Sequence, residues 1–285
     1  MTAQSKQRGR KAAMDEAASE AAAHRGNLPS AIDPGSLRGM DRSFAVLELL
    51  AQAPARVVDV TRALDLPWAT VHRTIVQLEK AQFLRRDPET SRYQIGPRLW
   101  HIGSAYLSNH RVLTAAMPYL AKLSELDGIA LQVVERIGWQ SVVIYSHQHV
   151  DEDITKAHYG YHFPLHCASK GHVLLANEPP AFIDAYLARP LERMTPETVT
   201  DPVRLREILN EVRASDFALT VGDVQLFAAS MAAPIRDATG HTVATLCFVF
   251  RKNLLKSDAR RETLREQIGH AAHSISLDLG WRHGR

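Results

Sequence analysis

The stretch Asp65-Leu66-Pro67-Trp68-Ala69-Thr70-Val71-His72-Arg73 decides the fold of the N-terminal part of the chain. Asp65 to Pro67 form a short turn, and the fixed φ of Pro67 suits the first position of a helix that runs to about residue 82. In this helix Val71, Ile75 and Leu78 lie four and three residues apart, which predicts one buried stripe. Arg73 then lies on the opposite, outward face.

Two helices precede this stretch and a hairpin follows it. Residues 40–53 have apolar side chains at helical spacing, and residues 57–64 form a second, shorter helix. After the third helix, residues 83–86 and 92–95 are typical of two strands joined by a turn. Three helices and an arginine-rich hairpin predict a winged helix-turn-helix domain over residues 37–98, whose third helix enters the major groove. The alternative is a small helical subdomain that only packs on its neighbour.

The outward face and the hairpin supply the candidate contacts to double-stranded DNA. Arg73 is the best candidate for base recognition because a guanidinium can bond O6 and N7 of guanine together. A phosphate contact, or a surface ion pair with Glu79 or Asp65, is the alternative. The hairpin arginines are expected to contact phosphates, which position the protein without specifying sequence. The predicted DNA-contacting residues are Trp68, Ala69, Thr70, His72, Arg73, Arg85, Arg86 and Arg92.

Positive charge is concentrated in the N-terminal third, although the net charge is only +3. Residues 1–100 hold 15 Lys and Arg against 11 Asp and Glu, whereas the rest of the chain holds 19 against 20. Such a positive field suits the DNA backbone. With 45% hydrophobic residues, two cysteines and no long uncharged apolar run, we expect a cytoplasmic protein with a packed core, no disulfide framework and no membrane segment.

The rest of the chain divides into a tail, a connecting helix and a larger domain. Residues 1–36 predict a disordered tail. Residues 99–110 predict a linker helix that is apolar around too much of its circumference for one small domain, so we expect it to be buried between protomers of a homodimer or homotetramer. Residues 111–285 mix helices with adjacent strand pairs, which predicts an α+β effector-binding domain around an antiparallel sheet. The strand pairs are 129–137 with 140–147, and 229–235 with 242–251.

Over roughly residues 37–280 the chain resembles the IclR-type bacterial transcriptional regulators. The resemblance rests on LRGMDRSFAVL at 37–47, LPWATVHR at 66–73, YQIG at 93–96, FPLHCASKG at 163–171, MAAPIRD at 231–237 and Gly240. It implies a winged-helix domain, a linker helix, a GAF-like effector domain, and dimers or tetramers on operator DNA. The run Cys247-Phe248-Val249-Phe250 is similar to regulators of aromatic-acid catabolism, so the expected effector is an aromatic or other small carboxylic acid.

The effector pocket is expected where the start of the helix after residue 166 faces the strands of Ser230 and Cys247. The free N–H groups of a helix N-terminus suit a carboxylate, apolar strand residues would wall the pocket, and His166 or Ser230 would bond a ring hydroxyl. The alternative is that these residues form the domain core and the ligand binds elsewhere. The predicted effector-contacting residues are His166, Cys167, Ala168, Ser169, Phe227, Ser230, Met231, Cys247 and Val249.

Histidine and cysteine residues leave a metal-binding sensor or an enzyme as the second class of function. Six histidines lie at positions 147–172, but their spacing fits no zinc signature and no cysteine pair completes a site. His166, Cys167 and Lys170 offer a base, a nucleophile and a cation, yet adjacent side chains seldom meet at one point and no Gly-x-Ser-x-Gly motif occurs. The sequence therefore favours a ligand-responsive regulator of a catabolic operon that is not an enzyme and uses neither metal nor cofactor.

Overall fold

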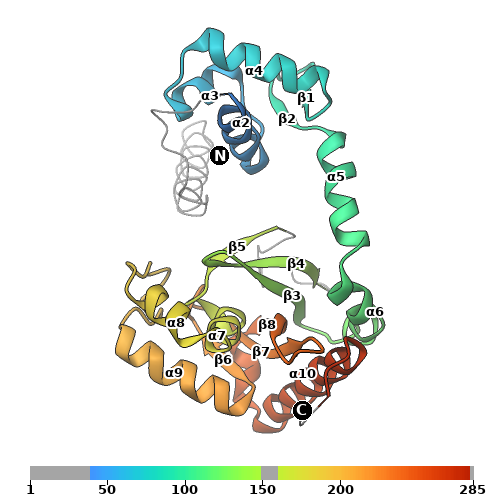
Figure 1. Ribbon diagram of the computed structural model, residues 1–285, viewed down its shortest axis with the longest axis vertical. Helices are drawn as coiled ribbons and strands as arrows, with labels where there is room; N and C mark the ends of the chain where they lie inside the picture. Colours follow the sequence, from blue (N-terminus) through green and yellow to red (C-terminus); the bar gives the residue numbers. More distant parts are fainter. Residues whose placement is uncertain (1–38, 149–159, 283–285) are drawn as a thin grey trace, which may run out of the picture. The chain divides into compact units, whose positions relative to one another are not determined.

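The computed structural model of the chain describes residues 39–148 and 160–282. The chain divides into two compact units, unit 1 (Met1–Tyr106) and unit 2 (Leu107–Arg285), whose elements are labelled in Figure 1. The tail predicted for residues 1–36 lies outside the described residues.

In its described part, unit 1 has three helices followed by a two-stranded hairpin. The elements are α2 (Met40–Gln52), α3 (Val57–Leu64), α4 (Trp68–Lys80), β1 (Leu84–Arg86) and β2 (Tyr93–Ile95). Val71 and Ile75 of the predicted stripe are completely buried against α2 and α3 residues such as Val46 and Val60, and Leu78 packs at the edge of this core. The predicted winged helix-turn-helix fold is confirmed.

The turn between α3 and α4 depends on a left-handed residue. Asp65 caps α3 with φ 51° and ψ 46°, a conformation that Asp tolerates better than most residues because its short side chain bonds locally. Pro67 stands one position before α4 rather than inside it. Among the described residues of unit 1, the outer face of α4 is exposed at Trp68, Ala69 and Arg73.

Helix α5 (Pro97–Ser108) follows the hairpin, and α6 (Arg111–Leu123) opens unit 2. None of the residues of α5 is buried, and Trp100 is 72% exposed, with Ile102 and Tyr106 about half exposed. Only a further surface can remove so much apolar area from water.

Unit 2 is built on an antiparallel sheet, which within the described residues has six strands in the order β5-β4-β3-β8-β7-β6. The strands are β3 (Ile129–Ile137), β4 (Gln140–Gln148), β5 (His162–Pro164), β6 (Ala218–Val221), β7 (Ala228–Arg236) and β8 (Thr242–Arg251). The four predicted strands are all present, and the two short edge strands β5 and β6 were not predicted.

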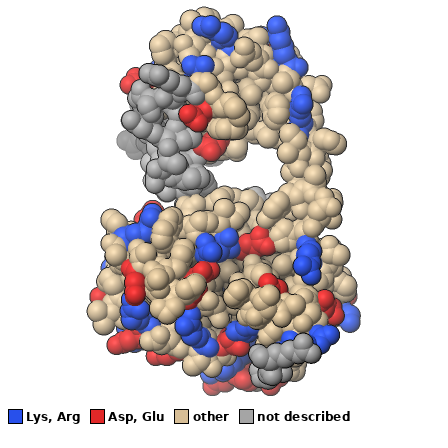
Figure 2. Space-filling view, viewed as in Figure 1, with Lys and Arg blue, Asp and Glu red and all other residues tan. Residues whose placement is uncertain are grey.

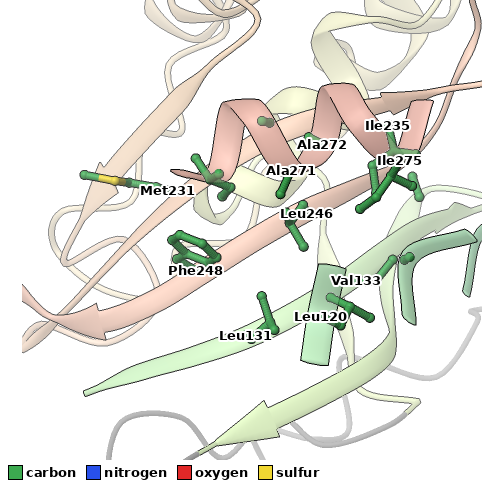
Figure 3. Packing of buried hydrophobic residues seen from close by; sticks show 14 of the residues in the cluster. Leu120, Leu131, Val133, Met231, Ile235, Leu246, Phe248, Ala271, Ala272 and Ile275 are labelled. Atoms are coloured by element: carbon green, nitrogen blue, oxygen red, sulfur yellow. The ribbon is translucent and has the colours of Figure 1, made fainter. Parts of the chain in front are cut away.

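Helices cover both faces of this sheet (Figure 1). On one face lie α6, the short 3-10 helix η3 (Lys252–Lys256) and α10 (Asp258–Asp278), over a core that includes Met231 and Phe248 (Figure 3). On the other face lie α7 (Ala168–Ala176), α8 (Pro180–Leu187) and α9 (Pro202–Ser215). Because successive strand residues point to opposite faces, β7 and β8 contribute alternate side chains to each layer. The predicted α+β class with an antiparallel sheet is confirmed.

Candidate DNA-binding surface and effector cavity

The outer face of α4 presents the side chains that the sequence predicts for DNA. Trp68, Ala69 and Arg73 are exposed, and the Trp68 ring stacks on His72 with their centroids 4.7 Å apart. Arg73 forms no ion pair or hydrogen bond within the described part of the chain, so its guanidinium is not held by Glu79 or Asp65. On the side of unit 1 drawn in Figure 2, Lys and Arg side chains lie over α4 and the hairpin.

Two of the hairpin arginines also make contacts inside unit 1. Arg86 donates to the Ser91 hydroxyl (3.0 Å), and Arg92 donates to the Pro54 carbonyl (3.0 Å), which ties the hairpin to the segment before α3. The tip is shaped by Asp87, whose carboxylate accepts the backbone N–H groups of Thr90 and Glu89, and these bonds lower its pKa. Arg85 is exposed.

A cavity in unit 2 lies between the start of α7 and strands β6, β7 and β8. Of the residues predicted for the effector, Ala168, Ser230 and Val249 line this cavity. The cavity has a volume of about 40 Å³, which is room for a few water molecules. The other lining residues are Phe163, Lys170, Thr220, Gly222, Asp223, Val224, Gln225, Ala228 and Ala229.

The N-terminus of α7 already has a carboxylate partner from the chain itself. Asp223, in the turn after β6, accepts the N–H of Ala168 through Oδ2 at 2.7 Å. Ala168 has φ 62°, a left-handed conformation that costs a non-glycine residue about 1 kcal/mol. The Ala168 N–H at the start of α7 therefore does bond a carboxylate, but that carboxylate belongs to a side chain 55 residues further along the chain.

A hydroxyl network satisfies the next donor of α7. The N–H of Ser169 donates to the hydroxyl oxygens of Thr220 (3.1 Å) and Ser230 (3.2 Å). The Ser169 hydroxyl donates to that of Ser230 at 2.8 Å, and its oxygen lies 3.9 Å from the Cys247 sulfur. Ser230 is thus placed at the helix start as predicted, while Cys247 is completely buried behind it and does not line the cavity.

Lys170 is the positive charge of the cavity. Its side chain is 3% exposed, its Nζ donates to Gln132 Oε1 at 2.9 Å, and it lies 3.9 Å from the centroid of the Phe163 ring. Burial lowers the pKa of this ammonium to about 8. Lys170 and Asp223 are not among the residues predicted for the effector, because a single sequence gives no sign that either is buried. The local signal for Lys170 is that it stands beside small residues.

Met231 does not belong to the pocket, and that prediction is wrong. Its side chain lies on the other face of the sheet, beside Phe248 and under α10 (Figure 3). Ser230, its neighbour in β7, points to the α7 face, and two successive strand residues cannot share a face. Phe227 stands before β7 with 40% of its surface exposed, and its ring contacts the Arg251 guanidinium rather than the cavity.

His166 and Cys167 are not arranged as a base and a nucleophile. The His166 ring bonds the Tyr186 hydroxyl and the Glu192 carbonyl, both at 2.8 Å, and burial lowers its pKa. Cys167 is completely buried, and burial raises the pKa of its thiol, which keeps it protonated. Neither side chain lines the cavity.

The histidine-rich segment is only partly described. His149 and His158 lie outside the described residues. Within residues 39–148 and 160–282, no group of three or more His, Cys, Asp or Glu side chains is placed to hold a metal ion. Every helix in these same ranges is too short or too polar to cross a membrane.

A winged helix whose third helix exposes an arginine, followed by an α+β unit with a cavity lined by apolar and polar side chains, is typical of a DNA-binding transcriptional regulator. The family "Bacterial transcriptional regulator IclR C-terminal" matches residues 104–277, and "IclR helix-turn-helix domain" matches residues 39–88. The chain belongs to the IclR family. The predicted resemblance and the prediction that the chain is a regulator rather than an enzyme are both confirmed by this membership.

The relatives match along most of their length. The chain is 29% identical over 254 residues to the HTH-type transcriptional regulator BhcR of Paracoccus denitrificans, covering 88% of this chain and 90% of the relative. It is 28% identical over 258 residues to the HTH-type transcriptional repressor AllR of Klebsiella pneumoniae, covering 88% and 94%. Among solved structures, an IclR homolog from Microbacterium hydrocarbonoxydans complexed with 4-hydroxybenzoate is similar with a TM-score of 0.74, 27% identity, and coverage of 84% and 97%.

Proposed function

We propose that the protein is a ligand-responsive regulator that binds operator DNA through α4 and the hairpin and binds a small carboxylic acid in the cavity at the start of α7. The observation that carries this proposal is the cavity itself, which combines a buried lysine, the hydroxyl groups of Thr220 and Ser230, and the apolar side chains of Phe163 and Val249. Pockets of this kind fix an acid by few polar groups and hold its body by apolar walls.

An aromatic acid is one member of the proposed class. The similar structure from M. hydrocarbonoxydans holds 4-hydroxybenzoate, which supports this choice. The cavity of this chain is smaller than a benzene ring needs, so an aromatic acid has to displace side chains such as Val224 and Gln225, which line it from the turn before β7. Acids of two to four carbons need less displacement.

The assembly and the location belong to the same proposal. A homodimer or homotetramer would bury Trp100 and Ile102 of α5, which are exposed in the single chain. Two copies of α4 would then meet the two halves of a palindromic operator. Regulation of a catabolic operon places the protein in the cytoplasm with the DNA.

Thermal unfolding with a panel of acids tests the effector site, because a ligand that binds only the folded protein raises its melting temperature. The panel holds acetate, propionate, lactate, benzoate and 4-hydroxybenzoate. Val249→Phe fills the cavity from β8, and Val203→Phe is the matched control because Val203 is exposed on α9. We expect at least one acid to stabilise the wild type and Val203→Phe but not Val249→Phe.

Binding to a DNA fragment selected by the protein from random sequence gives the second readout. The stabilising acid should change the affinity for this fragment in the wild type and leave Val249→Phe unchanged. Equal stabilisation of both variants would place the acid elsewhere, and an unchanged DNA affinity would remove the regulatory role of the cavity.

A further inference from the structure

We propose that Lys170 and Asp223 together determine which acid is bound: the effector carries a carboxylate for Lys170 and, in the same small molecule, a hydroxyl or amino group that donates to Asp223. This inference rests on the proposed function and adds the chemistry of the ligand to it. Both residues line the same cavity, one from α7 and one from the turn after β6.

The first observation is a buried cation with no anionic partner. Within the described part of the chain no carboxylate lies within ion-pair distance of Lys170 Nζ, whose hydrogen-bond acceptor is the neutral Gln132 amide. A buried ammonium is costly unless it is paired, because burial removes its hydration. Phe163 stabilises the charge through its ring face and cannot neutralise it. A ligand carboxylate in the cavity supplies the missing negative charge.

The second observation is a buried carboxylate oxygen with no donor. Asp223 is 7% exposed; its Oδ2 accepts the Ala168 N–H, while its Oδ1 has no hydrogen-bond partner among residues 39–148 and 160–282. The His172 ring has its Nε2 4.0 Å from Oδ2 and donates to the His166 carbonyl at 2.9 Å. An acceptor left unsatisfied in a buried site is destabilising, so a ligand that brings a donor to Oδ1 should bind more tightly than a ligand of the same skeleton without one.

The backbone holds Asp223 in this position. The Thr198 hydroxyl donates to the Asp223 carbonyl at 2.7 Å, and the Thr195 hydroxyl donates to the Gly222 carbonyl at 2.6 Å. Gly222 has φ 75°, and a Cβ there would lie 3.1 Å from the Glu197 side chain. Because the turn is fixed on both sides, Asp223 does not readily leave the helix start to make room for a second carboxylate. The ligand carboxylate is therefore assigned to Lys170.

Isothermal titration of the full chain with matched pairs of acids tests the inference. The acids of each pair share a skeleton. Lactate differs from propionate, and 4-hydroxybenzoate from benzoate, by one hydroxyl, whereas alanine differs from propionate by an ammonium group, which brings a positive charge together with its donors. In the wild type we expect the donor-bearing acid of at least one pair to bind about tenfold more tightly or better. The hydroxyl and amino arms distinguish the two kinds of donor.

Two variants separate the two roles. In Asp223→Asn the amide oxygen still accepts from Ala168 while an NH₂ replaces Oδ1, so the preference for the donor-bearing acid should be lost or reversed. In Lys170→Met every acid should bind about 100-fold more weakly, whereas the amide of the best acid, which has no charge, should lose much less. Two single variants at exposed residues, Lys252→Met and Asp184→Asn, are the controls. Both should bind the acids as tightly as the wild type does.

The outcomes separate this inference from the proposed function. If no acid of the panel binds the wild type, both are overturned. If acids bind but the members of each pair bind equally, or Lys170→Met binds as tightly as the wild type, the assignment to Lys170 and Asp223 is wrong and the carboxylic acid effector stands. Loss of the pair preference in Asp223→Asn, with acid binding retained, supports the inference.

Discussion

Replacing Lys170 by methionine should change how the stability of the protein depends on pH. Methionine has a similar length, fits among apolar side chains and removes the charge. In the folded protein burial lowers the pKa of Lys170 from 10.5 to about 8, so the folded state releases this proton more easily than the unfolded chain does. The free energy of unfolding of the wild type therefore rises through the window from about pH 8 to about pH 10.5, where the unfolded chain binds more protons.

The size of the effect follows from the two pKa values. A difference of one pKa unit corresponds to about 1.4 kcal/mol, so keeping the ammonium buried costs the folded protein about 3 kcal/mol at neutral pH. Lys170→Met regains this energy, but it loses the hydrogen bond from Lys170 to Gln132, which is worth about 1–3 kcal/mol between a charged and a neutral group and is lost at every pH. Of these two contributions, only the energy of burying the Lys170 ammonium depends on pH. We therefore expect the free energy of unfolding of Lys170→Met minus that of the wild type to fall by about 2 kcal/mol from about pH 7 to about pH 9.5.

Urea unfolding of the full chain, followed by circular dichroism at several pH values, measures this difference. Burial raises the pKa of both Cys167 and Cys247, and these thiols lower stability at alkaline pH in both proteins, so the comparison between the proteins largely cancels them. Lys252→Met, at an exposed lysine, is the control and should show a constant difference from the wild type. A constant difference for Lys170→Met as well would refute the argument that a charged lysine is buried in the cavity.

Three further outcomes follow from the described structure. Arg73→Ala should cost about 1–3 kcal/mol on the selected DNA and little on random DNA, and Arg73→Lys should behave similarly; equal losses on both DNAs would reassign Arg73 to phosphate. Trp100→Ser should weaken self-association measured by light scattering at micromolar concentration, and a wild type that is monomeric there would contradict the role given to α5. Gly171→Ala should destabilise the protein by about 1–3 kcal/mol because its Cβ would lie 2.5 Å from the Leu165 carbonyl oxygen. Gly103→Ala in α5, where a Cβ meets open space, should be neutral or slightly stabilising. Equal melting temperatures for the two variants would contradict this prediction.

Elements whose pattern is local could be predicted from the sequence, and elements that depend on distant partners could not. The stripe of Val71 and Ile75 and the alternating strands β7 and β8 carry their own periodicity. Strand β6 has four residues and exists because it pairs with β7, and β5 has three residues paired with β4. The missed β6 matters for function because it places Thr220 and leads into Asp223.

The effector site stays a prediction, and the structure tests only which of its residues lie together. The start of α7 and Ser230 do meet, through the hydrogen bond from the Ser169 N–H to the Ser230 hydroxyl. The Asp223 bond to Ala168 and the burial of Lys170 arise from tertiary packing, which no local pattern records. The prediction of Met231 in the pocket was wrong for a different reason. Successive strand residues point to opposite faces of the sheet, so Met231 and Ser230 cannot both face the pocket, and this could have been read from the sequence.

Burying Lys170 and Asp223 lowers the stability of the folded protein, and this loss determines how ligand binding at the cavity affects the rest of unit 2. In the part of the chain that the structure describes, the Lys170 ammonium has no carboxylate partner and Asp223 Oδ1 has no donor, and a cavity with two such groups is less stable than an apolar version of it. A ligand that satisfies both groups recovers that energy, and by linkage the same energy strengthens the contacts that hold the two groups in place. Those contacts are the Ala168 N–H at the start of α7 and the Thr195 and Thr198 hydroxyls before α9. The effector should therefore tighten the segment between α8 and α9 together with α7, and slower amide hydrogen exchange at these residues on addition of the acid is the expected sign of it.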